Sequence, residues 1–141
     1  KQKFRIVPSN IRLVVLKDVI RLLGEHTDLH WRQSIDMLAT TYKKQERDVS
    51  KNMINDVLLV ARDGQVIRTL KGKSLATAPI QLQLESENSF QEAVIRCDAA
   101  YLTGILGLDL PFDIEEAALA LYDSRKYIKY LQMVMSKWME K

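Results

Sequence analysis

Cysteine is almost absent from this chain of 141 residues, in which Cys97 is the only one. An intramolecular disulfide is therefore excluded, and so is a cysteine-based zinc site unless another chain contributes ligands. Because Cys97 falls within an apolar helical pattern, we expect an inert, buried thiol rather than a nucleophile. A reducing compartment fits this cysteine usage.

Long apolar runs are also missing. No stretch reaches the roughly 18 residues that a membrane-spanning helix requires, and no basic segment followed by an apolar one opens the chain as a signal. We therefore expect a soluble protein without membrane contact, cytoplasmic or associated with the nucleoid. Because the first residue is Lys1 rather than Met, we expect a processed chain or a fragment of something longer.

Motifs for enzyme chemistry are scarce. The chain has no glycine-rich phosphate loop, no nucleophile elbow and no His-Glu-x-x-His motif. His26 and His30 have a spacing that suits zinc on a helix, but Gly24 is placed to end the preceding helix and we expect a polar turn. The acidic residues between 109 and 116 are explained by a helix start, where carboxylates are favoured. We expect no enzyme activity, no cofactor and no metal.

The charged residues are unevenly divided along the chain. Residues 1–80 carry 15 Lys and Arg against 8 Asp and Glu, a balance of +7, and residues 81–141 carry 6 against 10, a balance of −4. A basic first half favours a polyanionic partner, while the acidic remainder would face protein or solvent. Ordinary surface variation is the alternative.

The composition, 47% hydrophobic and 28% charged residues, suits one or two small globular domains. Hydrophobic spacing predicts three helices in the first half, at about residues 11–23, 31–42 and 50–64. The third begins at Ser50, a good N-cap, and ends at Gly64. Its expected core stripe is Met53, Ile54, Val57, Leu58 and Ala61.

A β-hairpin is predicted after the third helix. Val66 and Ile67 begin a strand, residues 71–73 form the tip, and residues 75–77 return before Pro79. Residues 81–87 then read as a hinge or an edge segment. Three helices followed by such a hairpin are the element order of a winged helix-turn-helix.

The last third of the chain is predicted to be helical. Ser89 and Glu92 match a capping box at the start of a helix to about residue 106, and Asp113 caps the next helix. An amphipathic pattern from Ser124 continues to the end. Its stripe of large side chains has the spacing of a core or a dimer seam rather than of a ligand box: Tyr127, Leu131, Met135 and Trp138.

The outer face of the third helix carries groups suited to nucleic acid. If the core stripe faces inward, the opposite face presents Lys51, Asn52, Asn55 and Arg62. Asparagine can pair with adenine through two hydrogen bonds and lysine can donate to guanine, so this face could read the major groove. Asp56 would repel phosphate if it pointed the same way. Phosphate contacts are expected from the basic residues before the helix and around the hairpin: Lys43, Lys44, Arg47, Arg68, Lys71 and Lys73.

The segment from Ser50 to Lys73 resembles a family pattern. Its helix opens with serine and runs into a glycine, the apolar pair Val66-Ile67 and a basic Gly72-Lys73 tip, which is similar to the recognition helix and wing of bacterial winged-helix repressors of the GntR type. Gly64 falls one position early, and Ser74 replaces the second wing glycine. The resemblance implies a DNA-binding winged helix, with roles for Lys51, Asn52, Arg68, Lys71 and Lys73.

The expected fold is α+β, mainly α, with a winged helix at residues 9–80 and a helical assembly or dimerisation region at residues 86–141. We expect a transcriptional or replication regulator that contacts duplex DNA, with RNA not excluded and a homodimer formed through the C-terminal helices by analogy. The alternative is a protein-interaction or scaffold subunit of a larger complex, whose winged helix binds protein.

Overall fold

The computed structural model describes residues 9–84, 90, 92–97 and 100. Within residues 9–84 the chain forms, in order, α1 (Ser9–Glu25), α2 (Trp31–Lys44), α3 (Lys51–Asp63), β1 (Ile67–Thr69) and β2 (Ile80–Leu82). Helices dominate and the strands form one small antiparallel sheet, so the expected α+β, mainly α class is confirmed. None of the helices among these residues is long and apolar enough to cross a membrane.

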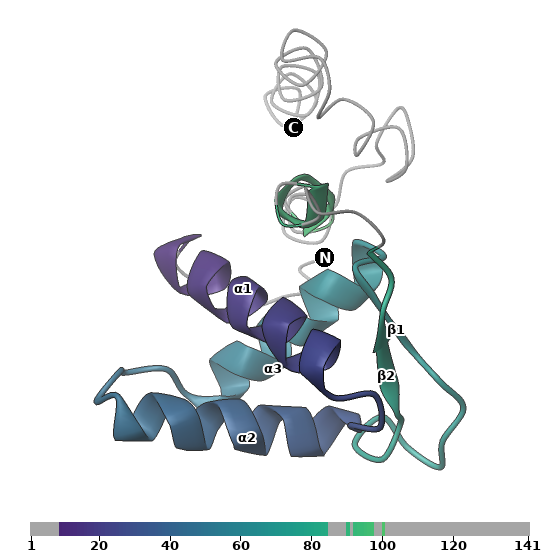
Figure 1. The fold of residues 1–141 in the computed structure, drawn as a ribbon, viewed down its shortest axis with the longest axis horizontal. Coiled ribbons are helices and arrows are strands. Elements are labelled where there is room, and N and C mark those ends of the chain that lie inside the picture. The colour runs from purple at the N-terminus through teal and green to yellow at the C-terminus, as the bar shows by residue number, and fades with distance from the viewer. Residues whose placement is uncertain (1–8, 85–89, 91, 98–99, 101–141) are drawn as a thin grey trace, which may run out of the picture.

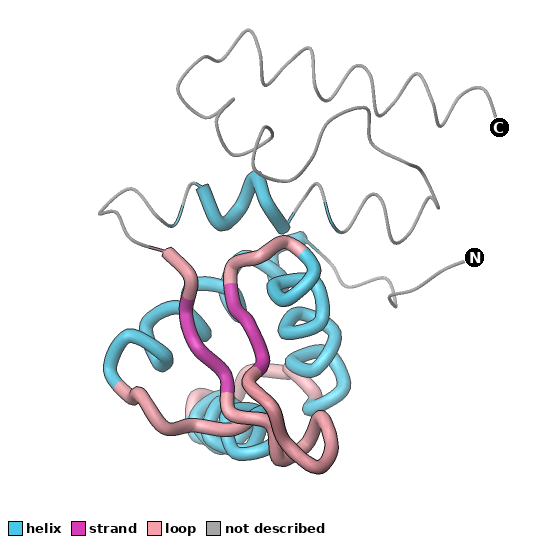
Figure 2. The backbone as a smooth tube through the Cα atoms, turned by 90° about the vertical axis from the view of Figure 1, so that its right-hand side faces the viewer, coloured by secondary structure: helices cyan, strands magenta, loops and turns pink. Residues whose placement is uncertain are grey.

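The hydrophobic core lies where the three helices meet the sheet. Figure 2 shows the two strands side by side in front of α1 and α3, with α2 below them. In α1 the buried side chains Val15, Val19 and Leu23 recur every four residues, so one face of the helix is covered. The other elements contribute side chains that are almost inaccessible to solvent: Tyr42, Ile54, Leu58, Ile67 and Ile80.

Local capping explains where α2 and α3 begin. The His30 Nδ1 atom accepts a hydrogen bond from the Gln33 backbone amide at 3.3 Å, and Gln33 Oε1 accepts one from the His30 amide at 3.5 Å. Ser50 Oγ accepts one from the Met53 amide at 3.2 Å, which confirms Ser50 as the N-cap of α3. Each cap satisfies an amide that the first helical turn leaves without a partner.

The ends of α2 and α3 depend on residues in the left-handed region. Glu46 has a φ of 56° and Gln65 a φ of 60°, and each follows the capping residue of its helix. After α3 the Gln65 amide donates to the Arg62 carbonyl and the Val66 amide to the Ala61 carbonyl, at 3.1 and 2.9 Å. These two bonds define a Schellman motif. Gly64, with a φ of −79°, is not the left-handed residue.

The predicted return strand at residues 75–77 is wrong. These residues lie in turns held by hydrogen bonds between Ser74 and Thr77, and the return strand begins after Pro79. Proline lacks an amide hydrogen, but its carbonyl still accepts a bond from the Leu70 amide at 2.8 Å, so it can precede a strand. The first two positions of the segment predicted as a hinge or edge, 81 and 82, accordingly belong to β2.

The register of the sheet pairs Ile67 with Leu82, Arg68 with Gln81 and Thr69 with Ile80. Residues 29–31 join the other side of the returning segment, since Ile80 donates to the Leu29 carbonyl and Trp31 donates to the Ala78 carbonyl, both at 2.9 Å. The segment between α1 and α2 therefore fixes the base of the hairpin.

A further helix packs on the end of α3. Residues 92–97 are helical, and Figures 1 and 2 place them on the side of α1 and α3 opposite to α2. Arg96 Nη1 donates to the Gln65 carbonyl at 2.9 Å, and the Arg96 backbone passes close to Gly64. Cys97 is buried, which confirms its expected burial. Ser89 and residues 101–141 lie outside the described residues, and with them the proposed dimer seam.

Candidate nucleic-acid interface

A groove lies between α2, the first turns of α3 and the β1–β2 loop. Its volume is about 460 Å³. The loop reaches it because the Arg32 amide donates to the Ala76 carbonyl at 3.0 Å, which ties the loop to the first turn of α2. We call it the α3 groove and define it by its lining residues: Trp31, Arg32, Ile35, Asp36, Lys51, Asn52, Asn55, Leu75 and Ala76.

Lys51 and Asp36 form an ion pair at the groove, with 3.1 Å between Lys51 Nζ and Asp36 Oδ1. The two side chains are 67% and 51% exposed, so water screens the attraction and the pair contributes at most about 1 kcal/mol. Lys51 can therefore leave Asp36 for a phosphate at little cost. The Asp36 carboxylate itself opposes the approach of a polyanion.

Asn55 and Arg62 both contact the Trp31 side chain. Trp31 Nε1 donates to Asn55 Oδ1 at 2.8 Å, and the Arg62 guanidinium lies 5.7 Å from the centre of the Trp31 ring. Trp31 is only 2% exposed. Asn55 and Arg62 are thus positioned by a buried ring on α2. Arg62 also lies beside Asp63, with 3.8 Å between Arg62 Nε and Asp63 Oδ1.

Asp56 follows Asn52 by four residues, so the two residues share a face of α3. Asp56 is nevertheless buried, with 8% of its surface exposed. The carboxylate that would repel phosphate is therefore largely shielded from solvent.

The β1–β2 loop carries exposed cations. Lys71 and Lys73 are exposed on either side of Gly72, where an added Cβ would lie 3.0 Å from Ala78 Cα. The two sides of the loop thus approach closely at this glycine. Arg68 donates through Nε and Nη2 to Gln81 Oε1, at 3.0 and 2.7 Å, so its guanidinium is held across the sheet.

Lys43, Lys44 and Arg47 are not brought to the α3 groove. They are exposed at the C-terminal end of α2 and in the turn that follows, whereas the groove contacts the first turns of that helix. At a rise of about 1.5 Å per residue, α2 separates the two ends by roughly 20 Å.

Sequence reasoning missed Arg32 and the apolar part of the groove. Arg32 is exposed in the first turn of α2, where the positive end of the helix dipole adds to its charge. The capping pattern at His30 could have placed Arg32 in that turn. The capping pattern does not indicate that this turn contacts Leu75 and Ala76, because that contact joins distant parts of the chain.

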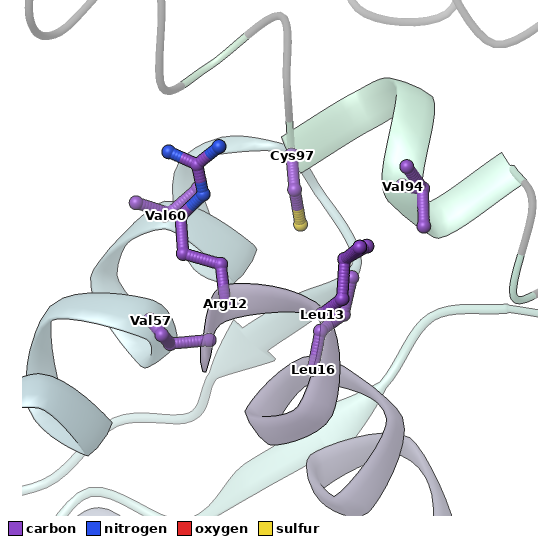
Figure 3. Close-up of a pocket in the computed structure, with 7 residues that line it drawn as sticks. All are labelled: Arg12, Leu13, Leu16, Val57, Val60, Val94 and Cys97. Atoms are coloured by element: carbon purple, nitrogen blue, oxygen red, sulfur yellow. The ribbon is translucent and has the colours of Figure 1, made fainter. Parts of the chain in front are cut away.

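A second pocket, of about 160 Å³, lies between α1, α3 and the helix at residues 92–97. Figure 3 shows Leu13 and Leu16 of α1 and Val57 and Val60 of α3 around it. The Cys97 thiol points into this mainly apolar space. Among the described residues, no group of three or more His, Cys, Asp and Glu side chains is placed to hold a metal ion.

No model of a known protein family matches the chain, and no curated protein or solved structure is significantly similar to it. The resemblance to GntR-type repressors receives no support from these comparisons. The function is therefore inferred from the geometry of the site alone.

Proposed function

We propose that residues 9–84 form a winged helix that binds duplex DNA, with the N-terminal half of α3 in the major groove and the β1–β2 loop on the neighbouring backbone. The observation that supports this function is the α3 groove, in which the outer face of α3, the first turn of α2 and the loop line one surface. The major groove is wide enough to admit a helix.

The charges around the groove suit phosphate binding. Arg32 and Lys51 line it, and Lys71 and Lys73 are exposed on the loop that also contributes Leu75 to it. Each cation that neutralises a phosphate releases a condensed counterion, so binding should weaken steeply as salt is added. Phosphate contacts of this kind set orientation, while Asn52 and Asn55 are left to contact bases.

A protein partner is the second candidate, and the apolar lining of the groove favours it. Leu75 is 38% exposed, and it lines the groove together with Ile35 and with the carboxylate of Asp36. A peptide that presents an apolar side chain next to a basic one would match these three groups.

Fluorescence anisotropy of a labelled duplex, titrated with the full chain over a salt series, tests the proposal. Lys71→Ala should weaken binding to every duplex and reduce the slope of log K against log salt by about one. Lys51→Ala should do the same. The matched control is Lys17→Ala, which removes an exposed lysine from α1 that does not line the α3 groove.

DNA binding would be refuted by the absence of any salt-dependent binding at low salt. Equal losses for Lys17→Ala and Lys71→Ala would refute the α3 groove and the β1–β2 loop as the binding surface, because they would mean that only the total charge matters. Absence of binding would leave the protein partner as the candidate, to be tested with peptides that alternate basic and apolar residues.

A further inference from the structure

The pocket between α1, α3 and the helix at residues 92–97 shares no lining residue with the α3 groove. Arg12 is the only charged residue that lines it in the described part of the chain. Figure 3 shows the Cys97 thiol pointing into this space. We call it the Cys97 pocket and define it by Arg12 and the apolar side chains around it: Leu13, Leu16, Val57, Val60, Val94 and Cys97.

The pocket exists because short side chains line it between elements whose positions are fixed. Three valines and a cysteine leave space that longer side chains would fill. The helix at residues 92–97 is held in place, since Arg96 Nη1 donates to the Gln65 carbonyl at 2.9 Å and the Arg96 backbone already lies close to Gly64. Atoms that face an empty space lack contact partners on that side, and a bound molecule would supply them.

We propose that the Cys97 pocket binds a small, uncharged, apolar molecule about the size of a single aromatic ring. The volume of the pocket is about 160 Å³. An apolar cavity of about 150 Å³ that is lined by aliphatic and aromatic side chains holds benzene, so the size and the lining both fit such a ligand. This site is separate from the proposed binding of DNA and does not depend on it.

The lining determines which chemistry the ligand must have. Leu16, Val57 and Val60 are each 3% exposed, so this wall of the pocket is aliphatic and buried. A hydroxyl or a charged group placed against it would lose its hydration without gaining a partner. Leu13 is 43% exposed, so the pocket reaches solvent beside this residue and a small molecule can enter without unfolding of the chain.

Thermal unfolding of the full chain, with benzene as the probe, tests the site. A ligand that binds only the folded chain raises Tm as its concentration rises above Kd. With benzene at ten times its Kd, the Tm of the wild type should rise by about 5 °C for a chain of this length. Naphthalene has two fused rings and should have no effect, because the pocket is too small for it. Benzoate keeps the single ring but adds a carboxylate, and it should have no effect either.

The variant Val94→Phe locates the site. The added ring should occupy the space of the ligand, so benzene should no longer raise the Tm of this variant. Val14→Phe is the matched control, because Val14 is also a partly buried valine packed against the core but does not line the pocket. This control should keep the full shift of the wild type.

Alkylation of Cys97 by iodoacetamide, followed by mass spectrometry, gives a second measurement that needs no variant. Cys97 is the only cysteine of the chain, so the gain in mass reports this site alone. Benzene at ten times its Kd should slow the reaction of the wild type by about tenfold, because only the unoccupied fraction reacts. Naphthalene should not slow it. This measurement tests the site even if Val94→Phe does not fold.

The inference is overturned if benzene fails to raise Tm or to protect Cys97, if naphthalene or benzoate acts as strongly as benzene, or if Val94→Phe keeps the shift. None of these measurements uses DNA. Failure of the Cys97 pocket would therefore leave the proposed function intact, and a chain that binds no duplex would still be expected to bind benzene.

Discussion

Replacing Gly64 by alanine probes how closely the helix at residues 92–97 packs on the end of α3. A Cβ atom at position 64 would lie 2.8 Å from the Arg96 carbonyl oxygen, 2.9 Å from the Arg96 carbonyl carbon and 3.2 Å from the Cys97 nitrogen. All three are backbone atoms, so no side-chain rotation can relieve the clash. The helix at residues 92–97 must move away or the end of α3 must distort.

The expected cost follows from two opposing effects. Alanine adopts the Gly64 φ of −79° without strain, and the reduced freedom of the unfolded chain would stabilise the variant by about 0.4–1 kcal/mol. Overpacking of a close contact costs about 1–3 kcal/mol. A retreat of the helix would also break the bond from Arg96 to the Gln65 carbonyl, worth about 1 kcal/mol. We expect Gly64→Ala to lower the free energy of unfolding by about 1–3.5 kcal/mol.

Urea unfolding of the full chain, followed by circular dichroism, measures this effect as a lower midpoint at an unchanged slope. Gly24→Ala is the control, because nothing lies within 4 Å of a Cβ at that position in the last turn of α1. It should stabilise the protein by about 0.5–1 kcal/mol, since alanine is the better helix former. If Gly64→Ala is neutral or stabilising like Gly24→Ala, the close packing at Gly64 is refuted.

Three other predictions concern single residues. Gln65→Gly should raise the free energy of unfolding by about 1 kcal/mol by relieving the positive φ, and a loss of stability would contradict this. Burial and a 2.7 Å hydrogen bond to Asp18 raise the pKa of Tyr42 above its ordinary value of 10.0. The unfolded chain therefore releases this proton first, and stability should fall as the pH rises above 10.0; Tyr42→Phe should lose less stability over that range in urea unfolding. Asp36→Asn should tighten DNA binding by roughly fivefold, about 1 kcal/mol, because it removes a carboxylate from the groove and frees Lys51. Unchanged or weaker binding in the anisotropy titration would argue against that role of Asp36.

The helices could be predicted because their signals are local. The N-cap Ser50 acts on an amide three residues away, and the apolar stripe of α3 repeats within one turn of the helix. α3 accordingly occupies Lys51–Asp63, within the range that the spacing indicated. Hydrophobic spacing likewise placed the start of α2 at Trp31.

The return strand of the hairpin could not be predicted, because tertiary contacts decide where it begins. Pro79 looked like a terminator, yet the chain around it is part of the sheet, because Pro79 accepts a hydrogen bond from Leu70 and its neighbours are bonded to Leu29 and Trp31. Gly64 was predicted to end α3, and it is the C-cap of that helix. The left-handed residue is the next one, Gln65, and Gly64 lies where the Arg96 backbone approaches.

The candidate site was also only partly predictable from the sequence. The 3.6-residue period was sufficient to place Lys51 and Asn52 on the exposed face of α3, and both are exposed. The contact of Trp31 with Asn55 joins residues 24 positions apart, and only the packing of α2 on α3 creates it. Sequence patterning therefore found the amide but not the hydrogen bond that holds it.

Asn55 and Lys51, which both line the groove, differ in how tightly their side chains are held, so we expect them to have different roles. Asn55 is bonded to a buried ring, whereas Lys51 is tied only by an exposed ion pair. Reading a base requires a fixed group, because a mobile amide can satisfy either a donor or an acceptor. Following a phosphate backbone requires a charge that can shift. Asn55→Ala should therefore change base preference with almost no effect on the salt slope, while Lys51→Ala should reduce the slope and leave the preference unchanged.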